Sequence, residues 1–188
     1  MLHRFPNHCH GRLRARVGIT LVEIIVVIAI MTISMAMYAQ TISSASRLDP
    51  VANETMLAAE GARLTLERMR AEDFDKVFAL YNADPTDDPG GPGTAPGNTF
   101  TIDGLLPSTT GGVVGRIDFP IVNGAPRETF VDEMLGLPRD LNCDGFVDGN
   151  SRALDYAILP FRVHVEWASK TGRQGKRSLD TYAMFSPL

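Results

Sequence analysis

Residues Ile19–Ala39 read ITLVEIIVVIAIMTISMAMYA, and this apolar run decides how the rest of the chain is organised. At about 1.5 Å per residue, a helix of this length spans about 30 Å, the thickness of the hydrocarbon core of a bilayer. The run therefore predicts a single transmembrane helix. Before it, residues 1–18 contain four arginines and no acidic residue. By the positive-inside rule they stay in the cytoplasm, and residues 40–188 lie outside it, anchored in the cytoplasmic (inner) membrane.

Three kinds of processing are compatible with such an N-terminus. A secretory signal peptide would be cut near Ser34-Met35-Ala36, a plain signal anchor would not be cut, and a prepilin-type leader would be cut before the apolar run. Glu23 distinguishes them, because a carboxylate inside a membrane helix costs about 2.5–3.5 kcal/mol on insertion scales. An acid at that cost indicates a function, which favours the prepilin-type leader.

The stretch Gly18-Ile19-Thr20-Leu21-Val22-Glu23 resembles the cleavage and methylation segment of type IV pilins and type II secretion pseudopilins. That family has a glycine, the cut, four mostly apolar residues, a glutamate and a long apolar helix; it most often has Phe after the cut, where this chain has Ile19. The resemblance implies cleavage after Gly18 by a prepilin peptidase and N-methylation of Ile19. It also implies that Glu23 pairs with the terminal amine of a neighbouring subunit during assembly. Such a pair forms in only one axial register, so it would fix the register of assembly.

Beyond the membrane, residues 40–83 are expected to continue the helix. Apolar residues recur at helical spacing from Val51 to Leu80, and Asp49-Pro50 is typical of a helix start, so we expect a short break or kink there. The alternative is two unrelated helices joined by a linker at 40–48. Residues 84–98, DPTDDPGGPGTAPGN, predict an exposed loop, because proline and glycine at this density exclude helix and central strand.

Residues 99–188 are expected to form a small antiparallel sheet, which gives the chain an α+β fold of pilin-like layout. Predicted strands lie at 100–106, 113–122 (with Pro120 at an edge or bulge), 127–131, 159–167 and 177–185. In the fourth, Phe161, Val163, Val165 and Trp167 alternate with polar residues, which is typical of a half-buried strand. The line FRVHVEWASKTGRQGKRSLDTYAMF resembles the closing hairpin of I-type minor pseudopilins and V-type minor pilins.

Within that region, residues 140–151, DLNCDGFVDGNS, have the spacing of an EF-hand or dockerin calcium loop. The predicted ligands are the side chains of Asp140, Asn142, Asp144 and Asp148 and the carbonyl of Phe146, with Gly145 at the sharp turn. Position twelve is Ser151 instead of a bidentate acid, so Asp155 or water would complete the site, with weak affinity of about 10⁻⁴ to 10⁻³ M. The alternative is an Asp- and Asn-rich turn without metal.

The composition argues against other functions. Outside residues 1–18 the chain has 14 basic and 22 acidic residues, which argues against nucleic acid as a partner. Removal of the leader leaves Cys143 as the one cysteine and His164 as the one histidine, so we expect no disulfide, no zinc site and no catalytic triad. Gly111–Gly115 does not have the spacing of a nucleotide-binding loop. The chain is therefore not expected to be an enzyme.

Together these features predict a structural subunit that is processed by prepilin peptidase and assembles with other pilin or pseudopilin subunits. The filament would be a type II secretion pseudopilus or a type IV pilus, with this chain as a minor subunit. The alternative is a membrane-anchored, calcium-dependent adhesion or scaffold module that does not polymerise.

Overall fold

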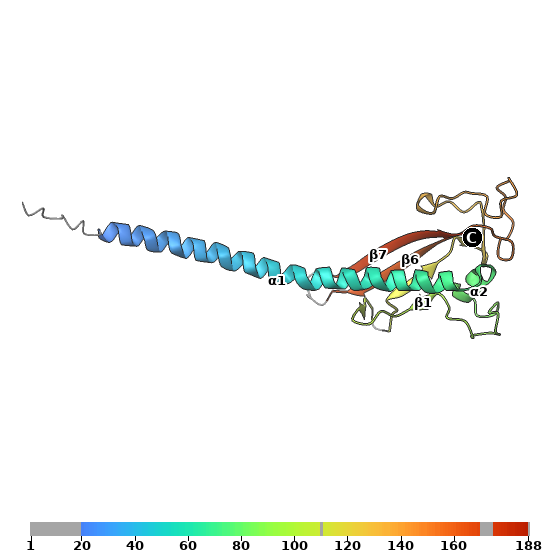
Figure 1. Ribbon diagram of the computed structural model, residues 1–188, viewed down its shortest axis with the longest axis horizontal. Helices are drawn as coiled ribbons and strands as arrows, with labels where there is room; N and C mark the ends of the chain where they lie inside the picture. Colours follow the sequence, from blue (N-terminus) through green and yellow to red (C-terminus); the bar gives the residue numbers. More distant parts are fainter. Residues whose placement is uncertain (1–19, 110, 170–174, 188) are drawn as a thin grey trace, which may run out of the picture. The chain divides into compact units, whose positions relative to one another are not determined.

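The computed structural model describes residues 20–109, 111–169 and 175–187. The chain divides into two compact units, an N-terminal unit, Met1–Ala45, and a C-terminal unit, Ser46–Leu188. The described chain begins with a long helix, followed by short helices and strands and then two ten-residue strands (Figure 1). This confirms the coarse prediction of an N-terminal apolar helix followed by a small antiparallel sheet, an α+β arrangement.

Helix α1 runs from Leu21 to Ala71. Thr20 caps its N-terminus, since its hydroxyl oxygen accepts a hydrogen bond from the backbone N–H of Glu23 at 3.3 Å. The break expected at Asp49-Pro50 was wrong, because the helix is continuous through both residues. A proline inside a helix removes one backbone hydrogen bond and crowds the carbonyl four residues earlier, but the hydrogen bonds of the turns on either side remain available to continue the helix.

Helix α1 ends earlier than the expected Leu80. A 3₁₀ turn, η1 (Phe74–Lys76), and a short helix, α2 (Val77–Tyr81), follow it. Tyr156 stabilises this change of direction: its hydroxyl donates to the carbonyl of Phe74 at 2.7 Å and accepts from the N–H of Phe78 at 3.3 Å. A side chain from far along the chain thus satisfies backbone groups that a continuous helix would have paired internally.

One sheet forms the body of the C-terminal unit. It contains β1 (Thr99–Phe100), β2 (Leu106–Pro107), β3 (Gly115–Asp118), β6 (Leu159–Ala168) and β7 (Lys176–Phe185). Strand order is β1-β3-β6-β2, and β7 pairs antiparallel with β6 along its whole length, from Leu159 opposite Phe185 to Ala168 opposite Lys176. The predicted C-terminal hairpin strands are confirmed.

The earlier strands are shorter than predicted. The single strand expected at 100–106 is instead β1 and β2, separated by a turn with Gly104 at a φ of 90°. The strand expected at 113–122 divides at Pro120 into β3 and β4 (Ile121–Val122), and β4 pairs with β5 (Ala125–Pro126) across Asn123-Gly124. Residues 127–131 form no strand, so that prediction was wrong; they lead into a second 3₁₀ turn, η2 (Glu133–Leu135). The predicted loop at 84–98 contains neither helix nor strand.

The core lies between the second half of α1 and β6 (Figure 1). Phe161, Val163, Val165 and Trp167 are buried, as their alternation predicted. On α1 the buried face is made of Glu54, Ala58, Ala62, Thr65 and Met69, spaced three or four residues apart. At the Glu54 end of this face the indole N–H of Trp167 donates to the buried carboxylate of Glu54 at 3.2 Å.

Gly115 provides a test of this packing. A Cβ added at this residue would lie 2.3 Å from the ring of Phe100, its partner across β1 and β3. We expect Gly115→Ala to lower the free energy of unfolding by about 1–3 kcal/mol, the usual cost of overpacking. Denaturant unfolding of the full chain in detergent, followed by the fluorescence of Trp167, the single tryptophan of the chain, measures this.

The matched control is Gly149→Ala, because no atom lies within 4 Å of a Cβ added at Gly149. It should change stability by less than about 0.5 kcal/mol, as surface substitutions do. Equal effects of the two substitutions would contradict the packing of Phe100 on Gly115.

Candidate functional site

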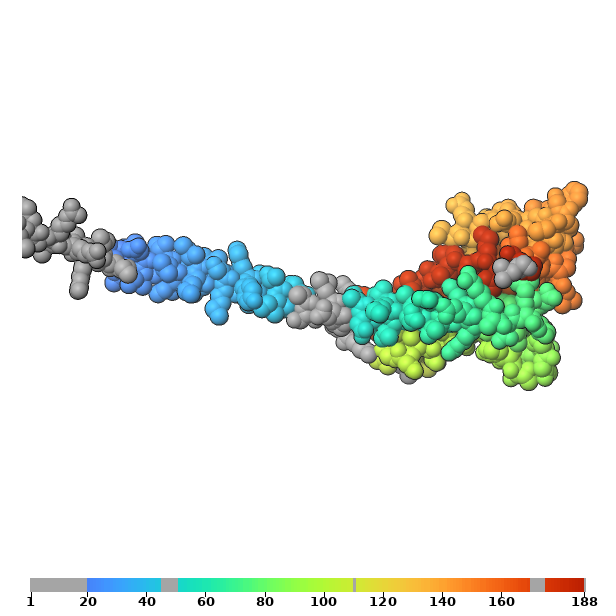
Figure 2. Space-filling view, viewed as in Figure 1, coloured from blue at the N-terminus to red at the C-terminus, as the bar shows by residue number. Residues whose placement is uncertain are grey.

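The first candidate site lies in the N-terminal unit. Residues Leu21–Ser44 form a helical segment long and apolar enough to cross a membrane, and none of it is buried within the chain (Figure 2, blue). This agrees with the predicted single-pass anchor. Gly18 and Ile19, the predicted cleavage and methylation residues, lie outside the described residues, whereas Glu23 is in the first turn of α1.

The polar side chains of this segment differ in whether they find a hydrogen-bond partner within the helix. Four hydroxyls donate to backbone carbonyls three or four residues earlier in the same helix, at 2.8–3.0 Å: Thr32, Ser34, Thr41 and Ser44. Such bonds remove the cost of placing a hydroxyl in hydrocarbon. Glu23 is different, because within the described residues its carboxylate has no hydrogen-bond or ion-pair partner.

Thr20 and Glu23 also have the spacing of a capping box, in which the acid would accept a bond from the N–H of the capping residue. The structure contains half of that motif, the bond to the hydroxyl of Thr20. A carboxylate in the first turn also interacts favourably with the helix dipole, which contributes at most about 1 kcal/mol at an exposed position. This is less than the cost of an acid in a membrane, so capping alone does not account for Glu23.

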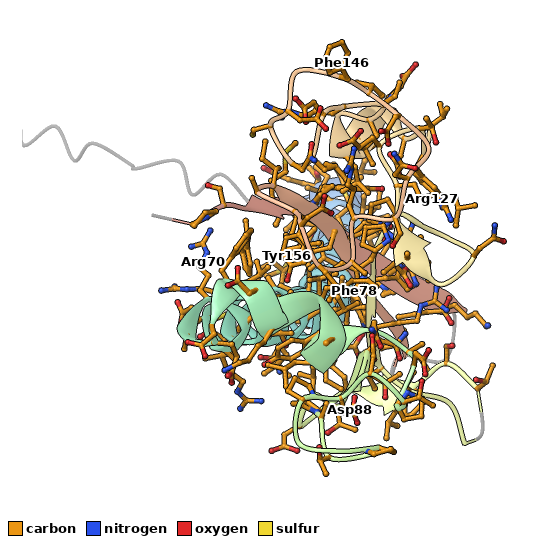
Figure 3. All side chains as sticks on the ribbon, turned by 90° about the vertical axis from the view of Figure 1, so that its right-hand side faces the viewer. Arg70, Phe78, Asp88, Arg127, Phe146 and Tyr156 are labelled. Atoms are coloured by element: carbon orange, nitrogen blue, oxygen red, sulfur yellow. The ribbon has the colours of Figure 1, made fainter. Side chains whose placement is uncertain are left out.

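The second candidate site is the predicted calcium loop in the C-terminal unit. Its backbone is held by Asx-type hydrogen bonds: Asp140 accepts from the N–H groups of Cys143 and Gly145, both at 2.7 Å, and Asp144 accepts from Phe146 at 2.9 Å. Gly145 has a φ of 90°, as the sharp turn requires. Phe146 lies at the outer tip of the loop, and the residue is 75% exposed (Figure 3). Cys143 is exposed, with a φ of 64°.

Several of the predicted ligand side chains gather around a guanidinium instead of around a point that a calcium ion could occupy. Among the described residues, no group of three or more Asp, Glu, His or Cys side chains is arranged to hold a metal ion. A guanidinium, that of Arg152, lies among the carboxylates instead, 3.0 Å from Asp148 and 3.5 Å from Asp144. As placed, these residues do not fit a calcium ion, because the arginine's charge would repel it. Calcium binding stays a prediction that a binding experiment must decide.

The residue pair that organises this region is Glu128 with Arg152, and sequence reasoning missed it. Glu128 is fully buried, and Arg152 is 5% exposed. The guanidinium donates to both carboxylate oxygens, at 2.9 Å and 3.3 Å. The same oxygens accept from the N–H groups of Leu141 at 2.9 Å and Asp148 at 2.9 Å. Glu128 therefore ties the start and the end of the loop to one buried point.

Ion pairs lie elsewhere on the sheet. His164 lies on the polar face of β6, and its Nδ1 is 2.7 Å from a carboxylate oxygen of Asp180, its cross-strand neighbour on β7. Arg162 bridges Asp118 at 2.7 Å and Asp180 at 3.8 Å. His164 is thus hydrogen-bonded, as expected for a histidine on a polar strand face. That the chain is not an enzyme stays a prediction.

Comparison with known proteins does not assign a family, because no family model, curated protein or solved structure matches the chain.

The buried pair makes the C-terminal unit sensitive to acid. Burial by itself raises the pKa of Glu128, but the N–H groups of Asp148 and Leu141 and the guanidinium of Arg152 together hold that pKa below its ordinary range. A carboxyl whose pKa is depressed by folding stabilises the protein above its unfolded-state pKa, about 4.3, and loses that contribution as pH falls through its folded pKa. We expect the free energy of unfolding to fall below about pH 4.3, with Glu128 contributing to that fall.

The measurement is the denaturant midpoint of the full chain in detergent at pH 7, 5, 4 and 3, an approximate series bracketing the ordinary carboxyl pKa. At pH 7 the Glu128→Gln variant should be less stable than the native chain. Between pH 5 and pH 3 its free energy of unfolding should fall by less than that of the native chain. Glu133→Gln, at an exposed glutamate of η2, should leave the pH dependence unchanged. Parallel pH profiles for Glu128→Gln and the native chain would contradict the pKa assignment.

Proposed function

We propose that the chain is a membrane-anchored subunit that assembles through the first half of α1 into a filament of the type IV pilin or type II secretion pseudopilin kind. The observation that carries the proposal is the unpaired carboxylate of Glu23. Four hydroxyl groups of Leu21–Ser44 form hydrogen bonds within the helix, whereas the carboxylate of Glu23 has no partner within the described residues. A cationic group from another molecule would relieve its cost.

The amine of Ile19 supplies that cation under this proposal. Cleavage after Gly18 would leave a positively charged terminus four residues before Glu23, within about one helical turn in sequence. An amine and a carboxylate that pair between neighbouring helices are both relieved of desolvation, and the pairing is satisfied at one axial offset only. The pair therefore determines how far one subunit is displaced along its neighbour.

The uncovered apolar surface of Leu21–Ser44 supports the same proposal. In a bilayer this surface contacts lipid, and in a filament the same side chains pack on those of neighbouring helices. The exposed side chains include large ones on all sides of the helix, such as the consecutive residues Ile25, Val26, Val27 and Ile28. A helix that is apolar all round is suited to a membrane or to the centre of a helical bundle. Peptidase, filament partners and cell compartment follow from the resemblance of residues 18–23.

The first test is chemical. N-terminal sequencing and mass spectrometry of the mature protein, made in a host with prepilin peptidase, should give a chain beginning at N-methylated Ile19. A chain beginning at Met1 or Met37 would overturn the proposal.

The second test uses assembly. Glu23→Ala should insert into the membrane normally but reduce incorporation into filaments by roughly tenfold or more, because the terminal amine of the neighbouring subunit then stays unpaired, at the cost of about 2.5–3.5 kcal/mol of a charge in the membrane. The readout is the fraction of subunit recovered in sheared filaments relative to the membrane fraction. Thr32→Val is the matched control, because the Thr32 hydroxyl bonds only to its own helix at 2.9 Å. Unchanged assembly of Glu23→Ala would refute the role of Glu23, and a native chain that never leaves the membrane fraction would favour a non-polymerising scaffold.

A further inference from the structure

The segment from Asp140 to Asp155 concentrates negative charge around one buried arginine. Arg152 lies within ion-pair distance of four carboxylates. Nε contacts Glu128 at 2.9 Å, Nη1 contacts Asp155 at 3.0 Å, and Nη2 contacts Asp148 at 3.0 Å and Asp144 at 3.5 Å. Its side chain is 6% exposed, whereas those of Asp144, Asp148 and Asp155 are 41%, 38% and 52% exposed. A single cation thus serves acids on all sides of the loop.

Three of these four acids are ones that the calcium motif would use: Asp144 and Asp148 as ligands, and Asp155 as the residue that would reach back. Calcium requires six to eight oxygens at 2.3–2.6 Å around one point. Arginine instead offers five N–H donors in a rigid plane, which bind carboxylates arranged around its edge. The arrangement found here is of the second kind.

We propose that Arg152 is the resident cation of this loop and does the work that calcium does in loops of the same sequence spacing. Its guanidinium neutralises the acids, and through Glu128 it fixes the backbone N–H groups of Leu141 and Asp148. The backbone N–H of Arg152 itself donates to the carbonyl of Pro126 at 3.0 Å, which attaches the end of the loop to β5. The loop is therefore folded whether or not calcium is present.

The fold places this loop beside the sheet. Turn η2 contacts β6 and β7, and the segment that carries the acids lies next to β7 in the space-filling view (Figure 2, orange beside red). A small separate core of Leu135, Leu137 and Leu141, packed with Phe130, Ile158 and Tyr182, lies beneath it. The surface formed by the loop, including Phe146 at its tip (Figure 3), would keep its shape outside the cell at any calcium concentration.

The deciding experiment measures calcium dependence in the full chain in nonionic detergent. Thermal unfolding is followed by Trp167 fluorescence in EGTA and in about 10 mM calcium, above the affinity range of weak extracellular sites. The native chain should give the same Tm in both, and isothermal titration should give no saturable calcium uptake. Arg152→Gln should lower Tm in EGTA by about 10 °C or more, because it leaves Glu128 buried without its counter-ion. Calcium should then restore part of this loss, since the freed carboxylates can hold the ion.

Two further variants keep the test decisive if Arg152→Gln does not fold. Glu128→Gln/Arg152→Gln removes both members of the buried pair and should have a higher Tm in EGTA than Arg152→Gln, because no unpaired charge remains. Arg139→Gln, at an exposed arginine before the loop, should leave Tm and calcium response unchanged. A calcium-induced rise in the native Tm, or saturable binding to the native chain, would overturn the proposal and support calcium as the ligand. A double variant no more stable than Arg152→Gln would also overturn it.

Discussion

The packing of β6 on the second half of α1 is the contact on which the C-terminal unit depends. The helix contributes the small buried side chains of Ala58, Ala62 and Thr65, and β6 contributes the large ones of Phe161 and Trp167. The alanines and the β6 residues belong to one buried apolar cluster, in which large side chains of the strand lie against small ones of the helix. Residues of η1, α2 and β3 join the same core, so their positions follow from this contact.

Features with a strong local pattern could be predicted from the sequence. The alternation in β6 and the 24-residue apolar segment of α1 each indicated both the element and its buried or unburied state. The local sequence pattern did not predict an element's boundary where a residue distant in the sequence contacts it. Helix α1 ends at Ala71 because Tyr156 satisfies the backbone of the turn that follows, and no pattern within residues 51–80 indicates that. The Asn123-Gly124 turn between β4 and β5 did carry a signal, because both residues have positive φ and Asn-Gly is the preferred pair for such hairpins.

The two candidate sites differ in the same way. Glu23 could be singled out from sequence because its neighbours are all apolar, so its cost is visible within a few residues. Glu128 could not, because nothing in residues 127–131 indicates a buried acid; its burial depends on Arg152, 24 positions later, and on backbone groups at Leu141 and Asp148. The calcium motif was recognised from the spacing of its oxygens alone. Spacing does not report which cation those oxygens face, and an arginine just past the end of the motif changes the electrostatics of the loop.

If Leu21–Ser44 crosses a membrane, as proposed, Glu23 and Glu128 present the same physical problem, a carboxylate held away from water, with different solutions. Glu128 receives a guanidinium and two backbone N–H groups from its own chain, so its charge is compensated before any other molecule is involved. The described part of the chain offers Glu23 nothing comparable. An acid that its own chain satisfies contributes to folding and can be understood from one molecule. An acid in an apolar segment without such a partner keeps its charge at low cost only if a cation from elsewhere pairs with it. That difference is the physical reason for assigning Glu128 to structure and Glu23 to assembly.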